Sequence, residues 1–134
     1  RPELAEAARF RAKRAGQLAS KMRFVSTQLL VLLKDELWLR NARVANAAAA
    51  KLAGGLDAIG IELAGEPRAN MVFARISPTA ADALRAAGFA GYEDGGTMRF
   101  CASWSTDEND IAALLNCIGA AHATPKCPMD RTCI

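Results

Sequence analysis

The apolar positions follow a helical period through the first half of the chain. Residues 2–15 carry a narrow apolar stripe, residues 24–33 are apolar on nearly every side, and residues 38–52 repeat apolar and small residues at spacings of four and three. Spacings of this kind place side chains on one face of a helix. The pattern predicts three helices, of which residues 24–33 are expected to form a short buried one.

Alternating apolar and polar positions appear in the second half of the chain, and this period predicts strands. Glycine and proline turns separate the strand candidates, which are residues 59–63, 70–76, 89–92 and 98–102. A small helix is expected over residues 79–87. Because short turns join the strands, we expect an antiparallel sheet with helices packed on one side, so the predicted fold class is α+β.

The last helix is expected to run from about Asp107 to Ala121, with Ser105 and Glu108 forming a capping box at its start. The predicted organisation then has three parts, which are helices over residues 1–55, a small α+β domain over residues 56–120 and an irregular tail over residues 121–134.

Composition and charge narrow the classes of partner. The 134 residues fit one domain and carry a net charge of +3. Residues 1–23 are basic but have few interleaved aromatic residues, so we expect a solvated helix face and no nucleic-acid partner. No apolar run approaches the ~20 residues that span a bilayer, so no membrane partner is expected. The four cysteines lack the C-x-x-C spacing of a zinc or redox site, which favours a reducing, cytoplasmic setting.

The residues do not form a self-sufficient active site. The single histidine, His122, lies near the end of the last predicted helix and has no visible partner. No cluster of histidine, cysteine and carboxylate residues has metal-ligand spacing, and no glycine-rich loop stands between a strand and a helix. The sequence therefore predicts no metal site and no catalytic residue within this chain.

Two arginines occupy positions where an anion would stabilise their charge. Arg99 lies inside the predicted strand 98–102, and Arg23 lies beside Lys21 where a linker meets a helix. A guanidinium group can bind a carboxylate or a phosphate through paired N–H donors. A strand arginine on a solvated face is the alternative for Arg99, and the residues alone leave both interpretations open.

Three segments together resemble a known family. They are residues 14–24 (RAGQLASKMRF), residues 35–40 (DELWLR) and residues 98–108 (MRFCASWSTDE). In order and spacing they resemble the C-terminal part of the low-specificity L-threonine aldolases. These enzymes form part of the beta-eliminating lyase branch of the aspartate-aminotransferase fold of pyridoxal-phosphate enzymes. The resemblance runs from about Arg1 to Ile118.

The resemblance implies a small C-terminal domain of a fold-type-I pyridoxal-phosphate enzyme, preceded by helices that lead from a large domain. The reaction it implies is cleavage of a β-hydroxy-α-amino acid to glycine and an aldehyde, with pyridoxal 5'-phosphate as the electron sink. Arg99 takes the place of the arginine that binds the substrate carboxylate. Lys21 and Arg23 lie near the cofactor phosphate, at an expected dimer interface.

The resemblance also implies what this chain lacks. The Schiff-base lysine and most cofactor ligands belong to the large domain, and neither Lys21 nor Lys34 lies in the family's lysine motif. The chain alone is therefore expected to be inactive, and its expected partners are an upstream cofactor-binding domain, further copies in a homodimer or homotetramer, and a small amino-acid substrate. The alternative is a non-catalytic α+β module that binds a small carboxylate ligand or a protein partner.

Overall fold

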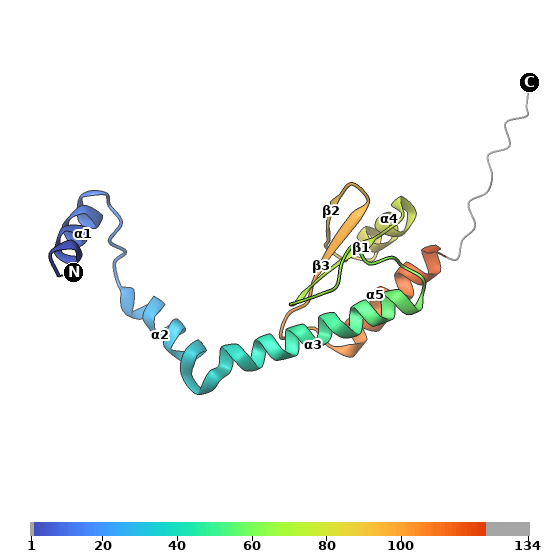
Figure 1. Ribbon diagram of the computed structural model, residues 1–134, viewed down its shortest axis with the longest axis horizontal. Helices are drawn as coiled ribbons and strands as arrows, with labels where there is room; N and C mark the ends of the chain where they lie inside the picture. The colour runs from blue at the N-terminus through green and yellow to red at the C-terminus, as the bar shows by residue number, and fades with distance from the viewer. Residues whose placement is uncertain (1, 123–134) are drawn as a thin grey trace, which may run out of the picture. The chain divides into compact units, whose positions relative to one another are not determined.

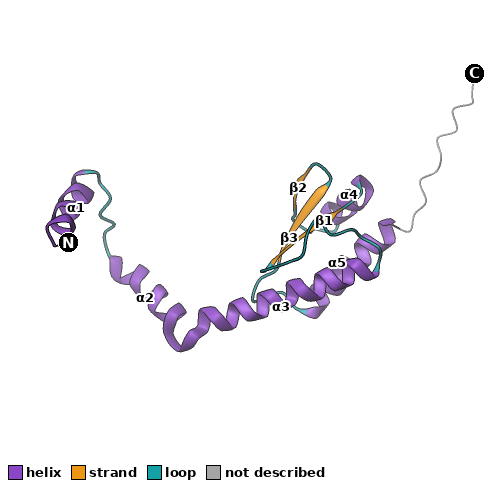
Figure 2. Cartoon of the chain, in the orientation of Figure 1, coloured by secondary structure: helices purple, strands orange, loops and turns teal. Residues whose placement is uncertain are grey.

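The computed structural model describes residues 2–122, and it shows helices together with a small antiparallel sheet (Figures 1 and 2). The predicted α+β class is confirmed. The chain divides between Trp38 and Leu39 into two compact units, which are described separately. In chain order the elements are α1 (Pro2–Arg14), α2 (Met22–Leu33), the 3-10 turn η1 (Lys34–Glu36), α3 (Leu37–Ala58), β1 (Met71–Arg75), α4 (Pro78–Ala86), β2 (Tyr92–Asp94), β3 (Thr97–Cys101) and α5 (Glu108–His122).

Helix α2 of the first unit is exposed, so the prediction of a buried helix over residues 24–33 is wrong. No residue of α2 is buried, and its large apolar side chains are 42–67% exposed. The apolar pattern is real, but the described residues of the first unit do not supply the surface that would cover it. Among the helices of residues 2–122, none combines the length and apolar character needed to cross a membrane.

The sheet of the second unit has the strand order β1-β3-β2, with both pairs antiparallel. Residues 59–63 do not form the expected strand, and only Leu63 makes an isolated bridge, to Ala74. The backbone N–H groups of Ile59, Gly60 and Ile61 instead donate to the last turn of α3, and Gly60 has a φ of 78°. The end of α3 therefore uses the groups that a strand would need.

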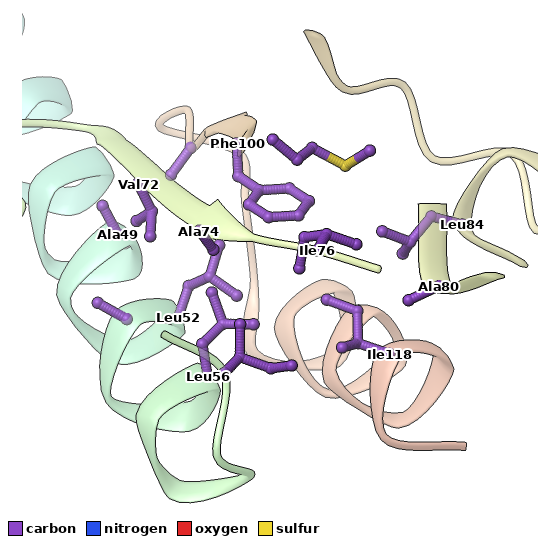
Figure 3. Packing of buried hydrophobic residues seen from close by; sticks show 14 of the residues in the cluster. Ala49, Leu52, Leu56, Val72, Ala74, Ile76, Ala80, Leu84, Phe100 and Ile118 are labelled. Atoms are coloured by element: carbon purple, nitrogen blue, oxygen red, sulfur yellow. The ribbon is translucent and has the colours of Figure 1, made fainter. Parts of the chain in front are cut away.

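The hydrophobic core lies on one face of the sheet, where α3, α4 and α5 meet it (Figure 3). Small residues of α3 allow close packing. A Cβ atom at Gly55 would lie 2.3 Å from a methyl carbon of Leu115 in α5. The residues at the centre of this core are Ala49, Leu52, Leu56, Val72, Ala74, Phe100, Leu84 and Ile118. Burial of this face leaves the opposite face of the sheet uncovered by the helices of the second unit.

The capping residues of α5 differ from the expected pair. The backbone N–H of Asp110 donates to Asp107 Oδ1 at 2.9 Å, and the backbone N–H of Asp107 donates to Asp110 Oδ2 at 3.1 Å. Glu108 instead accepts from Lys51 Nζ of α3 at 2.5 Å. This hydrogen bond and the lysine charge hold the pKa of Glu108 below its ordinary value. Helix α5 continues to His122, and the rest of the predicted tail, residues 123–134, lies outside the described residues.

Replacing Asp107 with alanine tests this cap. Asp107→Ala should lower the free energy of unfolding by about 1 kcal/mol, because the first turn of α5 loses its side-chain acceptor. Ser105→Ala is the matched control and should have a smaller effect, since the Ser105 hydroxyl contacts the hydroxyl of Ser103 and not the helix. Urea denaturation of the two variants measures both. A larger loss in Ser105→Ala would favour the capping box expected from the sequence.

Candidate anion-binding site

The face of the sheet that points away from the core carries alternate residues of all three strands. The burial of β1 and β3 alternates strictly, with Val72, Ala74, Met98 and Phe100 turned inward. The alternating period that predicted a strand over residues 70–76 is therefore matched by the burial of β1. The strand register assigns these residues to the open face: Met71, Phe73, Arg75, Tyr92, Asp94, Thr97, Arg99 and Cys101.

Arg99 lies at the centre of this open face. It belongs to the middle strand, β3, and the register pairs it with Phe73 of β1 on one side and Tyr92 of β2 on the other. Its guanidinium carbon, Cζ, lies over the Tyr92 ring, 5.3 Å from the ring centroid. Phe73 and Tyr92 are 42% and 62% exposed, so the arginine is flanked by accessible aromatic rings.

The other strand arginine, Arg75, has a fixed carboxylate partner. Its Nε donates to Glu62 at 3.0 Å. Arg85 of α4 likewise pairs with Asp82 at 2.7 Å and with Glu93. Arg99 forms no ion pair with any carboxylate in residues 2–122. Its N–H donors are therefore available to an external anion, which is the chemistry that a bidentate carboxylate site requires.

Lys21 and Arg23 lie in the first unit, at the start of α2. Lys21 occupies the N-cap position with a φ of 56°, and its side chain does not cap the helix. The Cζ atom of Arg23 lies over the Phe24 ring, 5.1 Å from its centroid. Neither cation pairs with a carboxylate of the described residues. Two cations beside uncapped helix N–H groups suit an anion. They and Arg99 belong to different units, and each group stands here as a separate candidate.

Tyr92 is the residue of this site that the sequence analysis missed. The strand before the turn was expected at residues 89–92, whereas β2 begins at Tyr92. A signal was present in the Gly95-Gly96 pair, since two such glycines favour a two-residue hairpin turn. Counting outward from that turn pairs Asp94 with Thr97 and Tyr92 with Arg99, as the register shows.

A metal role has no support in the described part of the chain. No group of three histidine, cysteine, aspartate or glutamate side chains within residues 2–122 could hold a metal ion. The open sheet face of this small α+β domain presents an exposed guanidinium group, whose paired N–H donors are of the kind that suits an organic anion.

Comparisons with known proteins identify relatives of this domain. No protein-family model matches the chain. Low specificity L-threonine aldolases from Pseudomonas sp. and Pseudomonas aeruginosa are 44% and 45% identical over 115 and 116 residues, which cover 84% of this chain and 33% of each relative. A solved structure of threonine aldolase from Leishmania major matches with a TM-score of 0.70 and 31% identity, over 84% of this chain and 34% of that chain.

The chain thus spans about a third of the length of the relatives that it matches. The resemblance to the low-specificity L-threonine aldolases is confirmed, and the matching part is the C-terminal part of that family.

Proposed function

We propose that this chain forms the C-terminal part of a pyridoxal-phosphate-dependent lyase that cleaves threonine-like β-hydroxy-α-amino acids to glycine and an aldehyde. The match to threonine aldolases supports the class of reaction. The observation within this chain that carries the proposal is the guanidinium of Arg99, which lies at the centre of the open sheet face and has no carboxylate partner among residues 2–122. In the proposed reaction the guanidinium donates two hydrogen bonds, through two of its N–H groups, to the substrate carboxylate.

Binding of the carboxylate by Arg99 would orient the amino acid without taking part in bond cleavage. A substrate that is held at one end by two parallel hydrogen bonds loses most of its rotational freedom before it reacts. Pyridoxal phosphate, when bound, supplies the electron sink for the charge left on Cα as the Cα–Cβ bond breaks. The contribution of this chain is thus substrate orientation, and the hard chemical step depends on the cofactor.

The residues at the start of α2 fit the phosphate of that cofactor in charge and in donor type. Lys21 and Arg23 provide two exposed cations, and the first turn of α2 provides backbone N–H groups with no side-chain cap. We assign the role of the Schiff-base lysine to neither Lys21 nor Lys34, and we propose that a large domain preceding this chain supplies that lysine. On this proposal the chain alone is inactive.

The exposed helix α2 supports an assembly larger than this chain. Eight large apolar side chains between Met22 and Leu33 are exposed, and burying such a surface is favourable by roughly 25 cal/mol per Å². We propose that the large domain and a further copy of the protein, in a homodimer or homotetramer, cover it. A cytoplasmic location stays a prediction.

The alternative, a non-catalytic module that binds a small carboxylate or a protein partner, also uses the free donors of Arg99. It differs from the proposal in one measurable respect, since it predicts amino-acid binding without cleavage. The assay of the complete protein below distinguishes the two.

Arg99 variants of the complete holoenzyme test the substrate role. Arg99→Ala should raise KM for L-threonine about 10- to 100-fold, because a hydrogen bond to a charged group contributes about 1.5–3 kcal/mol. The KM of Arg99→Lys should fall between those of Arg99→Ala and the wild type, since lysine keeps the positive charge but lacks the paired N–H donors of the guanidinium. Arg75→Gln on the same face is the control and should stay within about twofold. An unchanged KM in Arg99→Ala, or no cleavage of β-hydroxy-α-amino acids by the complete protein, would refute the proposal.

Substitution of Lys21 and Arg23 tests the cofactor role. Lys21→Met and Arg23→Met should each weaken pyridoxal-phosphate binding to the complete protein about tenfold, with the loss largest at low salt, because each removes one exposed charge from the phosphate. Equilibrium dialysis with absorbance detection gives the affinities, and Lys13→Met in α1 is the control. If the control weakens binding as much as Lys21→Met and Arg23→Met, the two residues have no specific contact with the phosphate.

A further inference from the structure

Arg99 needs a neighbouring group that orients its side chain, because a long exposed arginine loses conformational entropy when it is fixed. In many proteins that group is a carboxylate, as it is for Arg75, the other arginine of this sheet. Glu62 holds Arg75 at 3.0 Å. A carboxylate at Arg99 would occupy the donors and cancel the charge that an anionic ligand needs.

The structure supplies an aromatic ring in place of a carboxylate. Tyr92 lies directly across the β2–β3 pair from Arg99, and the Cζ atom of Arg99 lies over the Tyr92 ring at 5.3 Å from the centroid. A cation–π contact of this kind attracts the guanidinium through the ring face. The ring carries no negative charge and no carboxylate oxygen. The N–H groups of Arg99 therefore stay available to a ligand, and the positive charge of the guanidinium is not neutralised. The ring can therefore hold the side chain while its donors stay free.

The hairpin turn determines that the partner of Arg99 is Tyr92. Gly95 and Gly96 have φ values of 55° and 77°, the left-handed backbone that a two-residue hairpin turn needs and that glycine adopts without strain. The turn pairs Asp94 with Thr97, and this register brings Tyr92 opposite Arg99. Because successive strand side chains alternate between faces, a slip of one residue would place Glu93 opposite Arg99 and turn Tyr92 toward the core.

The carboxylates of β2 are kept away from Arg99 by the same register. Asp94 lies on the open face but is paired with Thr97, and it forms no ion pair with Arg99. Glu93 lies on the other face, where it pairs with Arg85 of α4. Tyr92, which lies opposite Arg99, is thus the one residue of β2 without a carboxylate that could neutralise the arginine charge.

We infer that Tyr92 is a positioning residue, which holds the guanidinium of Arg99 over its ring in an orientation that is ready for the substrate carboxylate. This inference rests on the proposed function, because it assumes that Arg99 binds the carboxylate of an amino acid. Tyr92 acts through Arg99 and not through a contact with the reacting atoms.

Two substitutions separate the ring from the hydroxyl group in the complete holoenzyme. Tyr92→Leu should raise KM for L-threonine about two- to fivefold and leave kcat unchanged, the range expected for loss of a cation–π contact at an exposed site. Tyr92→Phe keeps the ring and should remain within experimental error of the wild type. An increase in KM that Phe does not rescue, or no increase in Tyr92→Leu, would overturn the inference.

A double substitution shows whether Tyr92 acts through Arg99. In an Arg99→Gln background, Tyr92→Leu should cause no further rise in KM, since no cation remains for the ring to hold. The same rise in both backgrounds would mean that Tyr92 acts by another route, such as general support of the hairpin. If Arg99→Gln itself has no effect on KM, the proposed function fails, and that result is distinct from a failure of the Tyr92 inference alone.

The contact itself can be measured without turnover in the 134-residue chain. The δ-methylene protons of Arg99 should show an upfield ring-current shift in the NMR spectrum. Tyr92→Phe should preserve this shift and Tyr92→Leu should abolish it, with the spectrum of the core residues Val72 and Ala74 unchanged in both variants. An Arg99 shift that is the same in Tyr92→Leu as in the wild type would overturn the inference.

Discussion

The positively charged guanidinium of Arg99 lies on a sheet face that the helices of the second unit leave uncovered. This placement depends on the burial of the opposite face, where α3, α4 and α5 pack on Val72, Ala74, Met98 and Phe100. Because strand side chains alternate, burying these residues turns Arg99 outward. Arg99 is also in the middle strand, β3, so residues of β1 and of β2 flank it on either side. The hydrophobic effect thus positions a charged group that takes no part in the core.

What surrounds an arginine decides whether it serves structure or binding. Arg75 and Arg85 form ion pairs with carboxylates of the same domain, which neutralise their charge. Exposed ion pairs of this kind contribute about 0–1 kcal/mol each, so they do little for stability. Arg99 is held by Tyr92 and keeps its charge and donors. The difference between these environments is the reason for the proposal that Arg99 binds substrate.

Sequence reasoning succeeded where a period is strong and where both partners lie within the chain. The alternation through residues 71–75 predicted a strand with two distinct faces, and the structure shows that the face of Val72 and Ala74 is the buried one. It failed for α2, because an apolar pattern shows that a surface is to be buried and not which part of the molecule buries it. It failed at residues 59–61, where the end of α3 competes for the same backbone groups.

The candidate site was predictable in part for the same reasons. The position of Arg99 within a strand could be predicted, and so could its face once the period was known. The absence of a carboxylate partner within residues 2–122 could not, because ion pairs such as Arg75–Glu62 join residues that are 13 positions apart. Tyr92 was missed because the strand before the turn was expected three residues too early. Turn geometry at Gly95-Gly96 carried the information that side-chain period did not.

A crystal structure of the complete holoenzyme with bound glycine would test the central claim, that Arg99 binds the carboxylate of an amino acid. We predict that two N–H groups of Arg99 donate to the two carboxylate oxygens of glycine at about 2.7–2.9 Å, with the guanidinium still over the ring of Tyr92. A glycine carboxylate bound by other residues, with Arg99 turned away or paired with a protein carboxylate, would contradict the account.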